Sequence, residues 1–311
     1  MIDVHAHFTT PSYIEAAKSS GHRQADGMPE WFWPRWTPQS HIELMDKAGI
    51  AKSYLSLSSP GVHFGDDSAA RALAREVNDA GAAVTRDYPQ RFGLFASLPL
   101  PDIDGALLEL SRAHDALHVD GVIVLTNSQG LYLGNPALGP VLQEINRRSG
   151  VILIHPTSAK GSELVDCGRP RPMMEFLFET ARTVVDYLLS GNADRYPNIR
   201  LIIPHCSGVI PLLVERVQLF AALNPESEAE PVIAKLRRCF FDLASKPSAL
   251  QISALREVCP DEHLLYGSDY PWTSGDLAMK LLDNLDNVLE RDWRITTHKN
   301  AESLFKRVDR G

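Results

Sequence analysis

Eight short apolar segments recur along the chain, and longer segments with helical periodicity separate them. Apolar runs of this kind, rich in Val, Ile, Leu and Phe, are typical of parallel strands buried on both faces of a sheet. We predict strands at residues 1–7, 53–57, 92–96, 121–125, 151–154, 201–203, 240–243 and 264–266. Eight strand–helix units close a (β/α)8 barrel, so the 311 residues are expected to form one distorted TIM-barrel domain spanning 1–311.

Five polar side chains stand at or just beyond the ends of these predicted strands, namely His5, His7, His155, His205 and Asp269. In a TIM barrel, the carboxyl ends of the strands carry the active site. Side chains on a strand alternate with period two, so the imidazoles of His5 and His7 should point to the same side. Imidazole is a common ligand of zinc and related divalent metals, and the pair therefore predicts part of a metal site.

An irregular segment at residues 22–36 follows the first strand and carries four large aromatic side chains. These are Trp31, Phe32, Trp33 and Trp36, beside prolines that stiffen the backbone. Such a cluster is too large to leave in water, so we expect it to cover a pocket or a subunit interface. In a barrel this loop lies on the same face as His5 and His7, which favours Trp33 and Trp36 as part of a substrate pocket.

Composition excludes several classes of partner. The net charge of −8 is spread without long single-sign runs, which argues against nucleic acid as a partner. The four cysteines form no Cys-x-x-Cys pair, so neither disulfides nor a cysteine zinc site are expected, and a reducing compartment fits. No run approaches the roughly 20 apolar residues that span a bilayer, and no signal peptide pattern opens the chain. We expect a soluble cytoplasmic protein without membrane partners.

The motifs around the polar residues resemble those of the amidohydrolase superfamily. The segments are Ile2-Asp3-Val4-His5-Ala6-His7-Phe8, Ile154-His155-Pro156-Thr157, Pro204-His205-Cys206-Ser207-Gly208 and Gly267-Ser268-Asp269-Tyr270-Pro271. They are most similar to the decarboxylase branch, which includes aminocarboxymuconate-semialdehyde decarboxylase and the salicylate-type decarboxylases. Within that branch, residues 45–60 and 155–183 are closest to the 6-methylsalicylate decarboxylases. The resemblance covers essentially the whole chain.

This resemblance implies a mononuclear metal site. Members of the superfamily with two metals usually bridge them with a carboxylated lysine on the fourth strand, but no lysine lies between Lys52 and Lys160. One divalent ion per chain would be held by His5, His7, His155 and Asp269. Zinc is the first choice and manganese the alternative, because a shell of three histidines and one aspartate accommodates both.

The resemblance also assigns the catalytic groups. Asp269 would deliver a proton to the substrate, and His205 would orient Asp269 or activate an oxygen beside the metal. His205 could instead be a fifth ligand or an outer support of the site. Arg216, on the helix after the sixth strand, matches an arginine that binds a substrate carboxylate across a dimer interface; a solvated surface arginine is the alternative. A homodimer or a dimer of dimers is implied.

Three functions remain open at this stage. The first is nonoxidative decarboxylation of a small ortho-hydroxylated aromatic acid, with the metal contacting carboxylate and hydroxyl. The second is hydrolysis of a small lactone or cyclic amide, in which the metal would activate water. The third, a relative without catalytic activity, is disfavoured because all five polar site residues are present.

Overall fold

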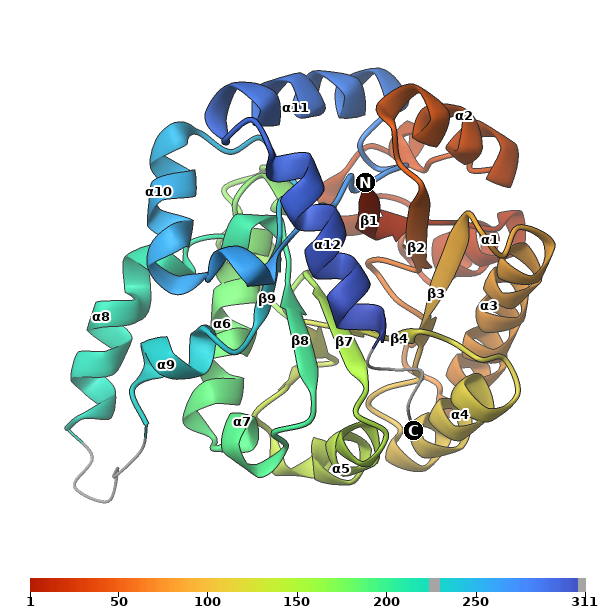
Figure 1. The fold of residues 1–311 in the computed structure, drawn as a ribbon. Helices are drawn as coiled ribbons and strands as arrows, with labels where there is room; N and C mark the ends of the chain where they lie inside the picture. The colour runs from red at the N-terminus through yellow and green to blue at the C-terminus, as the bar shows by residue number, and fades with distance from the viewer. Residues whose placement is uncertain (224–229, 307–311) are drawn as a thin grey trace.

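The computed structural model describes residues 1–223 and 230–306, which include eight parallel strands arranged as a nearly closed barrel (Figure 1). The strands neighbour one another in the order β1-β2-β3-β4-β7-β8-β9-β10. Their bounds are β1 Ile2–His7, β2 Lys52–Ser56, β3 Phe92–Ser97, β4 Gly121–Leu125, β7 Val151–His155, β8 Arg200–Ile203, β9 Phe240–Asp242 and β10 Leu264–Leu265. The TIM-barrel prediction is confirmed.

The first and last strands meet and close the barrel. The amide of Val4 donates a hydrogen bond of 2.9 Å to the carbonyl of Tyr266, and Asp3 forms a parallel bridge with the same residue. The β1–β2 pairing shifts register between Asp3 and Ala6, an irregularity that bends the strand. A short antiparallel hairpin, β5 Asn127–Ser128 with β6 Leu131–Tyr132, follows β4 and was not anticipated from the sequence.

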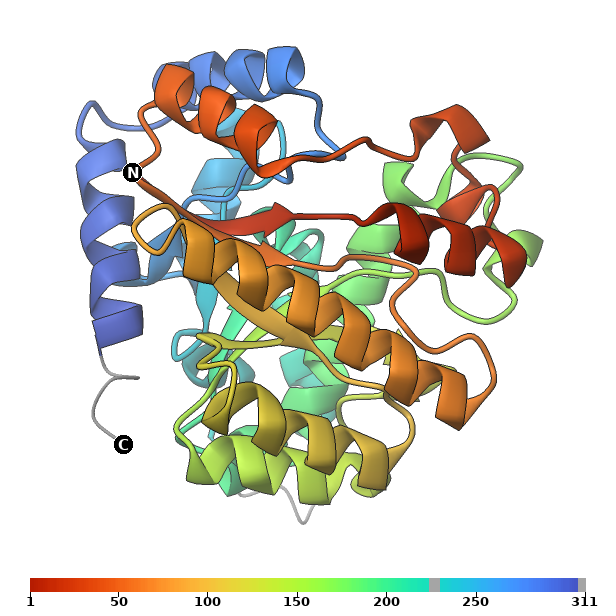
Figure 2. The ribbon, with the colours of Figure 1, turned by 90° about the vertical axis from the view of Figure 1, so that its right-hand side faces the viewer.

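Helices follow the strands and surround the barrel (Figures 1 and 2). The α-helices are α1 Pro11–Ser19, α2 Pro38–Ala48, α3 Asp67–Asp87, α4 Ile103–Asp115, α5 Gly139–Arg147, α6 Glu175–Leu189, α7 Asn192–Arg195, α8 Ile210–Ala221, α9 Val232–Leu236, α10 Ala249–Val258, α11 Gly275–Val288 and α12 Trp293–Lys306. Short 3-10 helices are η1 Ala25–Gly27, η2 Glu30–Phe32, η3 Pro136–Leu138, η4 Ser162–Leu164, η5 Arg171–Met173, η6 His205–Ser207 and η7 Asp261–His263. Within the described ranges, no helix is both long and apolar enough to cross a bilayer.

Helix α2 shows how local sequence sets these bounds. Thr37 accepts a hydrogen bond from the amide of Ser40, whose side chain in turn accepts from the Thr37 amide, and Pro38 occupies the first turn. This reciprocal capping satisfies two amides that the helix leaves free. At the other end Gly49 adopts φ 69°, the left-handed conformation that terminates helices.

Apolar side chains form two layers of core. One layer lies between the strands and the surrounding helices, and the other fills the barrel interior. Helix α12 closes the amino-terminal end of the barrel, where Phe305 stacks on Tyr54 with ring centroids 3.8 Å apart. Figure 2 shows α12 at one end of the strands and α1 at the opposite end. Side chains therefore fill the amino-terminal half of the barrel interior.

Candidate active site

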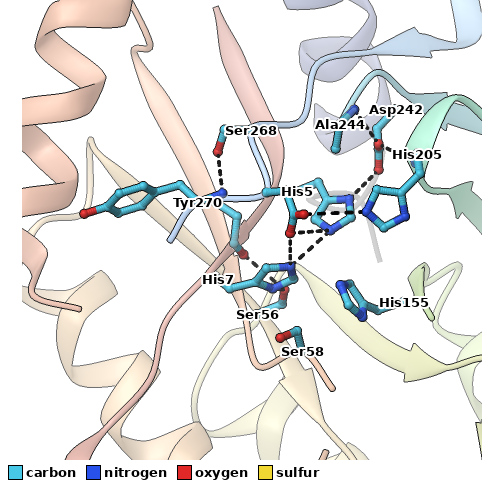
Figure 3. Close-up of polar contacts among 12 residues, drawn as sticks. His5, His7, Ser56, Ser58, His155, His205, Asp242, Ala244, Ser268 and Tyr270 are labelled. Carbon is cyan, nitrogen blue, oxygen red and sulfur yellow. Dashed lines mark hydrogen bonds and ion pairs between the residues drawn. The ribbon is translucent and has the colours of Figure 1, made fainter. Parts of the chain in front are cut away.

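Four metal-ligating side chains converge at the carboxyl ends of three strands (Figure 3). His5 and His7 come from β1, His155 ends β7, and Asp269 follows β10. The Nε2 atoms of His5 and His7 lie 3.1 Å apart, and Asp269 Oδ1 lies 3.2 Å from His7 Nε2. One ligand atom from each of the four lies within 4.8 Å of the others. The period-two prediction for His5 and His7 is confirmed.

Hydrogen bonds on the far side of two rings fix their tautomers. His5 Nδ1 lies 2.8 Å from Oδ2 of Asp242, and His155 Nδ1 lies 2.8 Å from the carbonyl oxygen of Pro156. A carboxylate and a carbonyl only accept, so both Nδ1 atoms carry the proton. The Nε2 lone pairs are then free to face the cluster, as a metal ligand requires.

The ring of His7 is held in the same way by a hydroxyl group. Ser56 donates its hydroxyl proton to the carbonyl of Ala6 at 3.1 Å, so its oxygen accepts from His7 Nδ1 at 2.8 Å. Once more Nε2 carries the lone pair. Three Nε2 lone pairs and one carboxylate thus point at a common position, an arrangement that repels itself unless a cation or proton lies between them.

Burial and charge set the protonation of these rings. Burial lowers the pKa of His7, and burial together with the neighbouring histidines lowers that of His155 well below its ordinary value. Burial also opposes protonation of His5, but the carboxylates of Asp242, Asp269 and Asp3 together outweigh it and raise the pKa of His5 to about 9. Metal binding at His5 therefore competes with a proton.

Asp269 lies between His7 and His205. Burial disfavours the charged carboxylate of Asp269, but its contacts with His205 and His7 hold its pKa well below the usual range. His205 Nε2 lies 3.8 Å from Oδ2 of Asp269, the oxygen that faces away from His7. Both residues adopt left-handed backbone conformations, with φ 56° for His205 and 55° for Asp269. Such conformations are unfavourable outside glycine and concentrate at functional sites.

The donor set fits one divalent ion. Three neutral imidazole nitrogens and a carboxylate suit zinc and manganese, and all four side chains are at least three-quarters buried. His205 is outside this group of four. It lies beside Asp269, and its ring packs on those of His5 and His155 with centroids 5.0 and 5.9 Å apart. Whether it is a ligand or acts only on Asp269 stays a prediction.

A cavity of about 400 Å³ opens onto the cluster. His155, His205 and Asp269 lie in its wall. Most of the remaining wall is apolar or aromatic and includes Met28, Phe32, Met173, Phe176, Leu177 and Trp272. The volume is in the range of small-molecule sites. A second cavity of similar size, lined in part by Leu98 and Asn127, contains none of the five polar residues.

The structure corrects the proposed placement of Trp33 and Trp36. Neither lines the cavity. The indole nitrogen of Trp33 donates to the carbonyl of Arg23, and its ring packs on Trp272 at 5.5 Å. Trp36 donates to His41 Nδ1 at 3.0 Å, away from the cavity. The irregular 22–36 backbone has no fixed side-chain period, so neighbouring rings point in unrelated directions.

Phe32 and Trp272 occupy the position that the sequence argument gave to Trp33 and Trp36. Their rings stack with centroids 5.9 Å apart and both line the cavity. Trp272 follows the Gly-Ser-Asp-Tyr-Pro motif by one residue, which was the available signal for its position. Trp31, in contrast, is 80 % exposed.

Sequence reasoning also missed Asp242 and Ser56. Asp242 ends β9 and Ser56 ends β2, at the same barrel face as His5 and His7. A carboxylate after two phenylalanines was the available signal for Asp242, whereas β2 is itself partly polar and gave no such signal for Ser56. Arg216 lies on α8, is exposed, and stacks over Phe220 with 5.0 Å from its guanidinium carbon to the ring centroid. It does not line the cavity within this chain.

Comparisons with known proteins place the chain in a family. The family model described as Amidohydrolase matches residues 2–307. Decarboxylase yanB of Aspergillus niger is 38% identical, covering 87% of this chain and 77% of that protein. A 6-methylsalicylic acid decarboxylase of Penicillium expansum is 32% identical, and the match covers 99% of this chain and 96% of that protein.

Solved structures share the fold. A dihydroxybenzoic acid decarboxylase from Polaromonas, crystallised with bound manganese and the inhibitor 2-nitroresorcinol, superimposes with a TM-score of 0.84. It is 22% identical and covers 100% of this chain and 97% of that one. Since the family model matches nearly all of the sequence, the chain belongs to the amidohydrolase family.

Proposed function

We propose that the protein is a metal-dependent, nonoxidative decarboxylase of a small ortho-hydroxylated aromatic acid similar to 6-methylsalicylate. The proposal rests on one observation: a largely apolar cavity has two members of the compact group of three histidines and one aspartate, His155 and Asp269, in its wall. An aromatic ring fits the cavity, and its carboxylate and hydroxyl can reach the cluster. The names of the two relatives above, both decarboxylases, support this choice.

His5, His7, His155 and Asp269 would hold one divalent ion. When bound, that ion would supply positive charge, which favours the carboxylate and the deprotonated ortho-hydroxyl of the substrate. Cleaving an aryl–carboxylate bond directly would leave an electron pair in a ring orbital, so the ring carbon must be protonated first. The contacts with His205 and His7 hold the pKa of Asp269 low, which favours its carboxylate form. It can therefore accept the proton of the ortho-hydroxyl and then deliver it to the ring carbon that bears the carboxylate.

The remaining steps balance without an oxidant. After the carbon is protonated, the carbon–carbon bond breaks, CO2 leaves, and the bonding electrons return to the ring to give a phenolate. The phenolate then takes a proton from solvent. In this scheme His205 holds Oδ2 of Asp269 during the two proton movements, and the apolar wall keeps water away from the ring carbon.

A panel of substrates tests the function directly. Metal-loaded protein is incubated with salicylate, 6-methylsalicylate, 2,6-dihydroxybenzoate and two aromatic lactones, and ultraviolet spectra are recorded. We expect loss of the carboxylated chromophore and release of CO2 for one or more ortho-hydroxylated acids only. Hydrolysis of a lactone with all the acids unchanged would favour the hydrolase alternative instead.

We predict one divalent ion per chain in freshly purified protein, with zinc favoured by the three imidazole ligands and manganese as the alternative. Chelation should abolish turnover, and one equivalent of ion should restore it. Elemental analysis and titration of the apoprotein measure both. Two ions per chain at full activity would contradict the mononuclear site.

The aromatic wall gives a prediction for substrate affinity. Replacing Phe32 with alanine removes one ring of the stacked pair that faces the cavity, so we expect KM to rise about tenfold. Leu108→Ala on α4 is the control, because that side chain is 68% exposed and lies outside the cavity wall, and its kinetics should be unchanged. Equal changes of KM in the two variants would show that Phe32 does not contact the substrate.

Helix α8 carries the surface that we propose for a homodimer. Leu212, Leu219 and Phe220 are 78%, 60% and 56% exposed, and Leu223 just beyond the helix is 69% exposed. Spacings of seven, eight and eleven residues place them on one helical face. Contiguous apolar surface of this kind is typical of interfaces between subunits. Arg216 lies on the same helix and would reach a substrate carboxylate of the partner subunit.

We expect Leu219→Asp to convert the dimer into a monomer in light-scattering measurements, because the charge would be buried at the interface. Leu250→Asp on α10, a residue that is 80 % exposed, should leave the mass unchanged. Arg216→Ala should preserve the dimer and raise KM. A monomeric wild-type protein would exclude both the interface and a role for Arg216 across it.

A further inference from the structure

Asp242 lies between the metal cluster and the turn that carries His205 (Figure 3). It is the last residue of β9 and is fully buried. Its Oδ2 accepts the 2.8 Å hydrogen bond from His5 Nδ1. Its Oδ1 accepts from the backbone amides of His205 at 3.0 Å and Ala244 at 2.9 Å. The two oxygens thus serve two different parts of the site.

We propose that Asp242 is a positioning residue that holds both the metal ligand His5 and the turn bearing His205. One oxygen sets the tautomer and orientation of His5, and the other ties the turn to the end of β9. The role of His205 in this inference rests on the proposed function. The metal-binding part does not, because it concerns the ligand group alone.

The effect on His5 follows from the chemistry of the two groups. An ionised carboxylate accepts hydrogen bonds and donates none, so its contact requires a proton on His5 Nδ1 and leaves the lone pair on Nε2. Without that acceptor, a neutral imidazole can carry its proton on Nε2, where it blocks a metal. Tight packing keeps the pair in register, since a Cβ at Gly267 would lie 2.7 Å from His5 Cβ and 3.3 Å from Asp242 Cγ.

The effect on His205 follows from the unusual backbone of its turn. Four successive residues have positive φ: His205 at 56°, Cys206 at 52°, Ser207 at 62° and Gly208 at 58°. Only glycine adopts this region without cost, so the surrounding contacts must hold the turn in place. The hydrogen bond from the His205 amide to Asp242 is charge-assisted and lies at the start of the run. It connects the turn to a barrel strand.

Three substitutions separate these roles. Asp242→Asn keeps one oxygen, which can still accept from the amides of His205 and Ala244, and turns an NH2 group toward His5. That change favours the wrong His5 tautomer and spares the turn. Asp242→Ala removes the contact with His5 and the contacts with the two backbone amides. Asp242→Leu removes the same contacts but fills the space of the aspartate, and it replaces the alanine variant if that variant does not fold.

The measurements use the full chain and do not depend on turnover. Zinc affinity is determined by competition with a chromogenic chelator, and the absorption spectrum of the Co2+-loaded protein reports ligand geometry. Hydrogen exchange of residues 203–209, followed by mass spectrometry, reports the turn. Glu179→Gln is the matched control, since this buried carboxylate bonds Tyr132 and Asn127 rather than the ligand group.

For Asp242→Asn we expect the zinc Kd to rise about 10–100-fold and the Co2+ spectrum to change, with exchange in 203–209 as in the wild type. For Asp242→Ala or Asp242→Leu we expect the same loss and about tenfold or more faster exchange in that segment. Glu179→Gln should change neither readout. The proposal would be overturned if Asp242→Asn had the zinc affinity and the Co2+ spectrum of the wild type. It would also be overturned if hydrogen exchange in residues 203–209 were unchanged in Asp242→Ala and Asp242→Leu. Failure of the substrate panel alone would leave these results untouched and reject only the decarboxylase assignment.

Discussion

Asp269→Asn is expected to lower kcat for decarboxylation by about 10²–10⁴-fold, the range lost with a catalytic proton donor. The amide has nearly the shape of the carboxylate and keeps one oxygen for the metal, but it cannot take up the hydroxyl proton and deliver it to the ring carbon. Loss of the negative charge also weakens metal binding, because Asp269 is the one carboxylate in the ligand group. Excess metal can offset the weaker binding but not the lost proton transfer, so the fall in kcat should persist at saturating metal.

The measurement is steady-state kinetics across a range of metal concentrations, with bound metal determined in the same samples. Asp276→Asn on α11 is the control for an aspartate-to-asparagine change outside the site, since Asp276 is exposed and lies outside the cavity wall. A metal-saturated Asp269→Asn protein with more than a tenth of the wild-type kcat would show that the proton comes from another group.

His205→Ala is expected to lower kcat by about 10²–10³-fold while most of the metal stays bound. The ring contacts Asp269 at 3.8 Å and lies outside the group of four ligands, so its removal should disturb proton movement rather than the ion. Kinetics and elemental analysis of the same preparation separate the two effects. KM should change little, because His205 is assigned to Asp269 and not to the substrate carboxylate.

The control for loss of an imidazole is His263→Ala, because that ring packs on Phe240 at the other end of the barrel strand and contacts no ligand. A His205→Ala protein that is empty of metal would place His205 among the ligands, which is the alternative left open by the sequence. Partial recovery of kcat by added imidazole would support the role in proton movement.

The sequence was sufficient for the barrel and for the group of ligands. Apolar runs predicted all eight strands within a few residues. A strand that is buried on both faces needs apolar side chains on both, so it is visible in the sequence as a nearly continuous apolar run. His5 and His7 could be paired from the period of a strand, a strictly local rule. His155, His205 and Asp269 could be added because a closed barrel brings every strand end to one face.

Only the tertiary structure decided which aromatic rings face the cavity and what holds the ligands. Phe32 faces inward while Trp33 and Trp36 turn away, since a segment of 3-10 turns has no repeating side-chain direction. The bond between His5 and Asp242 joins residues 237 positions apart. No local pattern encodes such a contact, because it depends on how β9 is placed beside β10 and β1 when the barrel closes.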